Sequence, residues 1–172
     1  HLDYHGTMEA YFAAKARLVE HLAPEGAAVV NLDDPAWRAL RPAARTVTFS
    51  AAGAAADVRI ADVAYEPRGS RGTLRAGDAA VPVHVPLIGD FNVANACAAA
   101  AAAWALGLPL DHIAAALATL PQVPGRLEVL HEGPTVLRDN AHTPDALARA
   151  LAAVRPFARG RLIVLFGAGG DR

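Results

Sequence analysis

The sequence lacks several features that mark particular classes of protein. It has one cysteine, Cys97, in 172 residues, so no disulfide can form within the chain, and a lone thiol in an alanine run is typical of a reducing compartment. Charged residues make up only 19% and the formal net charge is −1, which argues against the basic surface of a nucleic-acid-binding protein. We therefore expect a cytoplasmic protein with no nucleic-acid partner.

Long hydrophobic runs are also missing. The longest apolar stretch, residues 93–108, is interrupted by Asn95 and consists mostly of alanine, which favours a packed helix over membrane insertion. The chain starts at His1 without a methionine or a leader-like segment, and it stops at Gly-Gly-Asp-Arg directly after a predicted strand. We expect both ends to be cuts through a larger protein.

The first 120 residues predict an α/β arrangement. Thr7 can cap a helix that runs to about Leu22, and residues 27–32 form an apolar run typical of a strand buried on both faces. Short strand-like runs follow at residues 46–49, 58–65, 72–75 and 81–85. They predict a small antiparallel sheet inserted into the α/β domain. Helices are then expected from Asp90, as the cap, to about Leu106 and over residues 111–120.

Residues 121–125 contain two prolines and a glycine and mark the best domain boundary, which divides the chain into residues 1–125 and 126–172. The second part predicts strands at 127–131 and 135–138, a helix at 144–154 and a strand at 162–166. This pattern is typical of the start of a parallel βαβ unit of a Rossmann-like domain, in which ligands bind at the carboxyl ends of the strands.

Polar residues stand out at two predicted helices. Lys15 lies on a mostly apolar helix face, where burial of its ammonium would be costly. Its stem can instead pack while the amine reaches water, and the residues alone favour that reading. Asn92 and Asn95 share a face at a helix start, where they can either cap the helix or contact a ligand.

Four segments carry a resemblance to a known family. They are His-Leu-Asp-Tyr-His-Gly with Met-Glu-x-Tyr-x-x-Ala-Lys, then Gly-Asp-Phe-Asn-Val-Ala-Asn-Ala, Asp-Asn-Ala-His-Thr-Pro, and Phe-Gly-Ala-Gly-Gly-Asp-Arg. In this order, and over essentially the whole chain, they resemble the Mur ligases, most closely the UDP-N-acetylmuramoyl-tripeptide synthetases. The resemblance implies the C-terminal part of the central ATPase domain, followed by the start of the amino-acid-binding domain.

The same resemblance implies an activity. The enzyme would use ATP and Mg²⁺ to join a diamino acid, meso-diaminopimelate or L-lysine, to UDP-N-acetylmuramoyl-L-alanyl-D-glutamate through an acyl phosphate, in peptidoglycan biosynthesis. In the family the lysine that matches Lys15 is carbamylated and becomes an anionic, catalytic ligand near an active-site magnesium, and the histidine that matches His1 is a ligand of the second magnesium. Removal of an amine from water favours its neutral, nucleophilic form, and carbamate oxygens suit magnesium.

The resemblance also assigns contacts with the nucleotide and the substrate. The nucleotide contacts are Asn92 and Asn95 beside the adenine, Asp139 at the ribose, and Arg126 and His142. Arg172 would bind the carboxylate of the incoming amino acid. Two positions depart from the family pattern, because Asn140 replaces a tyrosine and Ala168 replaces the usual cysteine.

The sequence contains no Gly-x-x-Gly-Lys-Ser/Thr loop for a triphosphate and no Asp-Asn-Pro-Arg segment, so we expect this chain to be inactive by itself. Alternatives are a related ligase of the folylpolyglutamate or cyanophycin type, a non-catalytic nucleotide-binding module, or a piece without independent function. The residues do not choose between lysine and diaminopimelate, and they give no oligomeric state.

Overall fold

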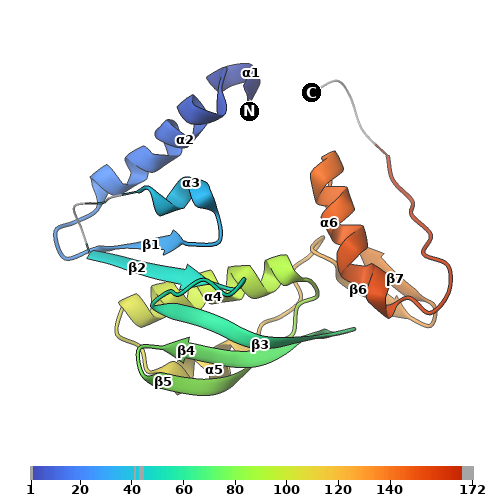
Figure 1. The fold of residues 1–172 in the computed structure, drawn as a ribbon. Coiled ribbons are helices and arrows are strands. Elements are labelled where there is room, and N and C mark those ends of the chain that lie inside the picture. Colours follow the sequence, from blue (N-terminus) through green and yellow to red (C-terminus); the bar gives the residue numbers. More distant parts are fainter. Residues whose placement is uncertain (1, 41, 43–44, 168–172) are drawn as a thin grey trace.

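The structure, a computed structural model, describes residues 2–40, 42 and 45–167. Figure 1 shows a central sheet with helices and a separate C-terminal hairpin with its helix. The elements are α1 (Leu2–His5), α2 (Met8–Ala16), η1 (Arg17–His21), β1 (Ala27–Asn31), α3 (Pro35–Arg38), β2 (Arg45–Ser50), β3 (Val58–Glu66), β4 (Gly69–Ala76), β5 (Ala79–Val85), α4 (Asp90–Ala105), α5 (Leu110–Ala118), β6 (Glu128–Glu132), β7 (Thr135–Arg138), α6 (Pro144–Val154) and η2 (Arg155–Phe157).

The N-terminal helix begins where the sequence predicts. The Thr7 hydroxyl accepts a hydrogen bond from the Ala10 amide at 3.1 Å, which satisfies one of the free amides of the first turn of α2. The helix is α-helical only to Ala16 and continues as the 3-10 helix η1. None of α1, α2 and η1 contains a buried residue, so the expected apolar face does not pack into a core.

The strands predicted between residues 27 and 85 are all present, in one sheet of order β1-β2-β3-β4-β5. Strands β1, β2 and β3 are parallel, while β4 and β5 add antiparallel neighbours at the same sheet. The antiparallel block therefore extends the parallel sheet instead of forming an inserted one. In strand β1, Ala28 and Val30 on one face are buried, whereas Ala27 and Val29 on the other face are only half-buried against the main core.

Helix α4 packs on this sheet through small side chains. Ala96, Cys97 and Ala100 are buried against residues of β2, β3 and β4 in the main core, and their small size lets the helix backbone lie close to the strands. The N-cap of α4 is Gly89, with φ 101°, and not Asp90 as predicted. The Asp90 carboxylate instead accepts the amide of Phe91 at 2.8 Å.

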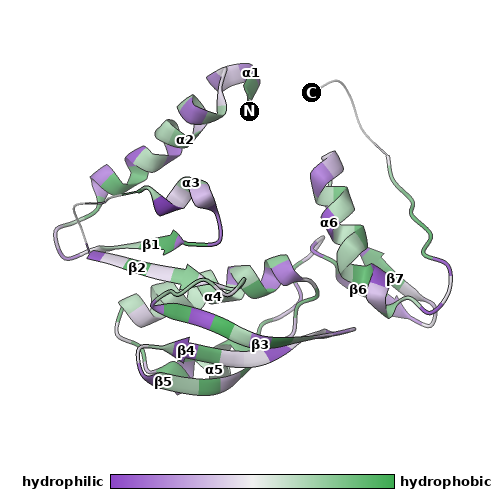
Figure 2. Ribbon diagram, in the orientation of Figure 1, coloured by the Kyte–Doolittle hydropathy of each residue, from purple (hydrophilic) through white to green (hydrophobic). Residues whose placement is uncertain are grey.

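The C-terminal part contains an antiparallel hairpin, β6–β7, followed by α6. The predicted helix start is confirmed, because the Thr143 hydroxyl accepts the Ala146 amide at 3.3 Å and Pro144 occupies the first turn. The strand predicted at residues 162–166 is not formed. Those residues follow η2 as the apolar tail in Figure 2, with Leu165 95% exposed. A strand needs a hydrogen-bonded neighbour, and the described hairpin sheet has only β6 and β7.

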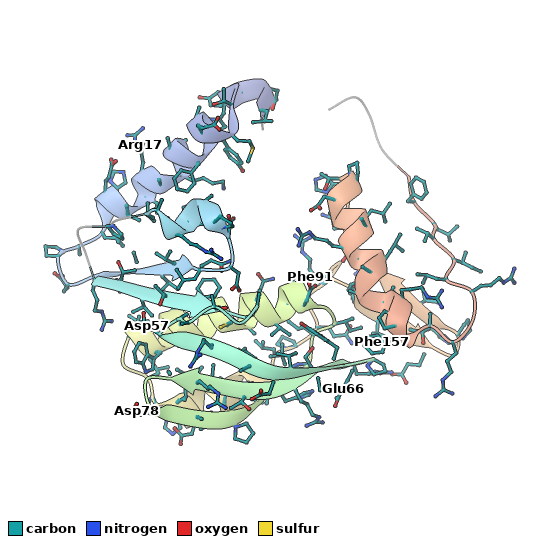
Figure 3. The ribbon with its side chains drawn as sticks, viewed as in Figure 1. Arg17, Asp57, Glu66, Asp78, Phe91 and Phe157 are labelled. Carbon is teal, nitrogen blue, oxygen red and sulfur yellow. The ribbon has the colours of Figure 1, made fainter. Side chains whose placement is uncertain are left out.

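A second apolar cluster, here called the junction cluster, connects the two parts. Ile88 and Phe91, at the start of α4, pack against Leu127 and Ala150 of the C-terminal part. Val129, Leu137, Ala153 and Val154 complete the cluster. Figure 3 shows Phe91 where the start of α4 faces α6. In the described ranges no helix combines the length and the apolarity needed to cross a membrane.

Candidate functional site

One carboxylate that the sequence analysis did not single out, Asp33, fixes the carboxyl ends of β1 and β2. Asp33 accepts the Ser50 hydroxyl at 2.5 Å and the backbone amides of Ala51 and Ala52 at 2.8 and 3.1 Å. The Cys97 thiol of α4 donates to the Ser50 carbonyl at 3.3 Å. These bonds hold the ends of β1 and β2 beside α4. The Asn-x-Asp-Asp pattern after β1 could have signalled this carboxylate.

The two asparagines at the start of α4 have different environments. Asn92 is buried, and its amide nitrogen donates to the Ile88 carbonyl at 2.8 Å. Asn95 donates to the Asn92 side-chain oxygen at 3.5 Å and is exposed. Asn92 therefore fixes the loop that leads into the helix, whereas Asn95 keeps donor and acceptor capacity at the surface.

Asp139 follows β7 and is half-buried. Its carboxylate accepts the Leu127 amide at 2.9 Å and the Ala141 amide at 2.8 Å, so it connects the entrance of the hairpin to its exit. A carboxylate has about four acceptor positions, which leaves capacity for a hydroxyl. His142, three residues on, is exposed and its Nδ1 lies 2.9 Å from the Asn140 carbonyl.

Arg126 lies between Gly125 and Leu127 at the junction and has an exposed side chain. It lines a cavity of about 20 Å³ together with Arg68 and Ile88, a volume that holds about one water molecule. The neighbouring Glu128 carboxylate binds the Gly125 amide and the Arg138 guanidinium. These bonds lower the pKa of Glu128 below its ordinary value. The hydrogen bond from the Gly125 amide has the larger effect, and the hydrogen bond from the Arg138 side chain the next largest.

Lys15 is exposed and not on a packed face, which corrects the expected burial of its stem. No residue of α2 is buried, and its Phe12 ring packs on Trp37 of α3 with 4.8 Å between the ring centroids. The Lys15 Nζ lies 5.0 Å from the centroid of the Tyr11 ring, in a cation–π contact. His1 and Arg172, the other predicted metal and substrate contacts, lie outside the described residues. Over the described ranges, no three His, Cys, Asp or Glu residues gather closely enough to hold a metal ion.

Asn92 and Asn95 therefore lie at the start of α4, beside Ile88 and Phe91, which contact the C-terminal part in the junction cluster.

Two sequence profiles match the chain: the Mur ligase middle domain over residues 1–103, and the "Mur ligase, glutamate ligase domain" over residues 125–172. The chain belongs to the Mur ligase family. The α/β fold class is confirmed by the structural relatives of this family.

Individual relatives of this Mur ligase chain are similar over its whole length. It is 48% identical to the UDP-N-acetylmuramoyl-L-alanyl-D-glutamate--2,6-diaminopimelate ligase of Synechococcus elongatus, covering 100% of the chain and 36% of that protein. A solved ligase of the same description is 37% identical with a TM-score of 0.77, over 100% of this chain and 37% of the other.

A crystal structure of MurF from Acinetobacter baumannii is 28% identical with a TM-score of 0.81, over 90% of this chain and 35% of that one. The chain therefore spans about a third of the length of the relatives that it matches.

Proposed function

We propose that the chain is the nucleotide-side part of a cytoplasmic, ATP-dependent ligase that joins meso-diaminopimelate to UDP-N-acetylmuramoyl-L-alanyl-D-glutamate. The observation that carries the proposal is the match of the entire chain, at 42–48% identity, to ligases named for diaminopimelate. Those names favour diaminopimelate over L-lysine and disfavour a folylpolyglutamate-type ligase. Peptidoglycan precursors would be the class of product.

The described residues fit a nucleotide beside the start of α4. Asn95 offers an exposed amide, which suits a base edge because it can donate and accept. Asp139 retains acceptor positions for ribose hydroxyls, and Arg126 offers an exposed guanidinium for phosphate oxygens. We assign Asn92 a different role from the adenine contact first expected, because its amide nitrogen already binds the Ile88 carbonyl.

Bound ATP would supply a phosphoryl group that converts the side-chain carboxylate of D-glutamate into an acyl phosphate. The chain's own residues would orient the base and the ribose and would place positive charge near the phosphates. The amine of the diamino acid would then attack the activated carbonyl. The residues of this chain are therefore positioning and electrostatic groups in the proposal.

The described residues do not by themselves fit a magnesium site. No suitable group of three ligands is present among them, and an exposed Lys15 ammonium would repel a cation. A carbamate on Lys15 would replace this cation by oxygen ligands of the kind that magnesium prefers. We therefore derive no catalytic step through the metal from these residues.

Replacement of Lys15 by alanine tests the carbamate. We expect it to abolish ligation when this segment replaces the matching 36% of the Synechococcus ligase, because the anion formed from carbon dioxide would be lost. Short carboxylates such as acetate should restore part of the activity. Arg17→Ala, which removes an exposed cation two residues later, at the start of η1 (Figure 3), is the matched control and should stay active. Undiminished turnover without Lys15 would rule out the carbamate.

A further inference from the structure

Leu127 has an unusual backbone conformation at the junction. Its φ is 45°, in the left-handed region that large side chains rarely adopt. The side chain is only 5% exposed and packs in the junction cluster with Ile88 and Phe91. Such a conformation persists only where the surrounding contacts fix it. Contacts of the neighbouring residues must therefore keep the backbone at Leu127 in this conformation.

Hydrogen bonds donated by three consecutive amides hold this backbone. The Gly125 amide donates to Glu128 Oε2 at 2.9 Å, and the Leu127 amide donates to Asp139 Oδ2 at 2.9 Å. Between them, the Arg126 amide donates to the Val123 carbonyl at 3.0 Å. The direction in which the Arg126 side chain leaves the backbone is set by these three bonds.

Glu128 connects this segment to Arg138, the last residue of β7, which lies directly opposite Glu128 at the open end of the hairpin. The same oxygen, Oε2, accepts Nε and Nη2 of Arg138 at 2.9 and 2.6 Å. Arg138 directly precedes Asp139, whose carboxylate holds the Leu127 amide. Bonds between a carboxylate and a guanidinium are charge-assisted and therefore stronger than neutral ones. One carboxylate thus fixes the segment before Arg126 and the residue before Asp139.

We propose that Glu128 is a positioning residue for nucleotide binding: it sets where Arg126 and Asp139 stand relative to the start of α4. This inference rests on the proposed function, because it assumes that Arg126 and Asp139 contact the nucleotide. Glu128 itself would not touch the ligand. Its carboxylate is occupied by Gly125 and Arg138, and its side chain is 19% exposed.

The test is a titration of the 172-residue chain with ADP, followed by amide chemical shifts. Glu128→Gln keeps the shape and one acceptor oxygen but removes the charge that binds Arg138, and Glu128→Ala removes both. We expect ADP to bind about tenfold more weakly in Glu128→Gln, as loss of a charge-assisted bond predicts, and more weakly still in Glu128→Ala. The amide signals of Gly125 and Leu127 should move in both variants.

The matched control is Glu132→Gln. Glu132 lies in the same hairpin and forms an ion pair with Arg68, but it is exposed and binds no amide of the junction. Its replacement should leave ADP binding unchanged. Thermal unfolding of each variant shows whether the fold is kept, and the conservative Glu128→Gln keeps the test valid if Glu128→Ala does not fold.

A double-mutant cycle with Arg126→Ala separates positioning from simple destabilisation. If Glu128 acts through Arg126, loss of Arg126 should weaken binding much less in the Glu128→Gln background than in the unaltered chain. Additive effects, or unchanged ADP binding in Glu128→Gln, would overturn the positioning role alone. If the unaltered chain binds no ADP, or Arg126→Ala has no effect in it, the nucleotide role and the positioning role both fail.

Discussion

Cys97 is the one thiol of the chain and it has no exposed surface. Burial raises its pKa from 9.0 to about 11, although hydrogen bonding with the backbone of Ile60 and Ser50 opposes part of this shift. The thiolate is the reactive form of cysteine. A raised pKa therefore protects this residue at neutral pH, in addition to the steric cover of α4 and the sheet.

We predict slow alkylation of Cys97 in the folded chain. At pH 8, the two-unit rise in pKa alone lowers the thiolate fraction about a hundredfold. Iodoacetamide should therefore react at least that much more slowly in the native chain than in urea. The native rate should keep rising with pH beyond 9. Equal rates in the two states would contradict the burial of this thiol.

Single side chains show how far the sequence can be read at this scale. Thr7 was predicted as a cap and is one, because a cap bonds an amide three residues away. Thr143 makes the same kind of bond at the start of α6. Lys15 was expected on a packed face, but the element that such a face contacts is non-local and is not encoded in helix periodicity. The inward turn of Asn92 likewise depends on the Ile88 carbonyl, which the loop conformation places within reach.

At the scale of elements, the loop into α4 depends on Gly89. Its φ of 101° and ψ of 151° fall in a region that is essentially limited to glycine. A Cβ at this position would lie 2.8 Å from the Phe91 ring. That ring cannot move freely, because it packs in the junction cluster. The strain and the contact together make this glycine necessary for the helix start.

Gly89→Ala should therefore destabilise the chain by about 2–4 kcal/mol, from backbone strain and overpacking combined. Gly107→Ala is the matched control, because Gly107 also has a positive φ, 86°, but a Cβ there meets nothing within 4 Å. We expect a loss of about 1–2 kcal/mol for that control. Urea unfolding measures both. Equal losses would show that the Phe91 contact does not contribute.

The strands and helices themselves were largely predictable, whereas their pairing was not. Alternation and turn residues identified β2 to β5, but only the hydrogen-bond register shows that β3 joins the parallel β2 on one side and the antiparallel β4 on the other. The run Leu162–Phe166 has the composition of a strand and yet forms none. Composition selects residues that suit a strand, but a pairing neighbour is needed to form one.

At the scale of the molecule, two parts meet at one small cluster. The main core lies between the five-stranded sheet and helices α4 and α5, and the junction cluster joins it to β6, β7 and α6. We retain the boundary between residues 125 and 126 as a proposal. The strained Leu127 and its hydrogen bonds stand directly after it, so the relative position of the two parts would be set there.

We propose above that this chain serves a diaminopimelate ligase, and a chimera tests that proposal most directly. The chain replaces the matching segment of the Synechococcus ligase, to which it is 48% identical, and ATP-dependent product formation is measured with each diamino acid. We predict activity with meso-diaminopimelate that is lost in the Asn95→Ala, Arg126→Ala double variant. A folded chimera that makes no product, or one whose activity survives that double variant, would contradict the account.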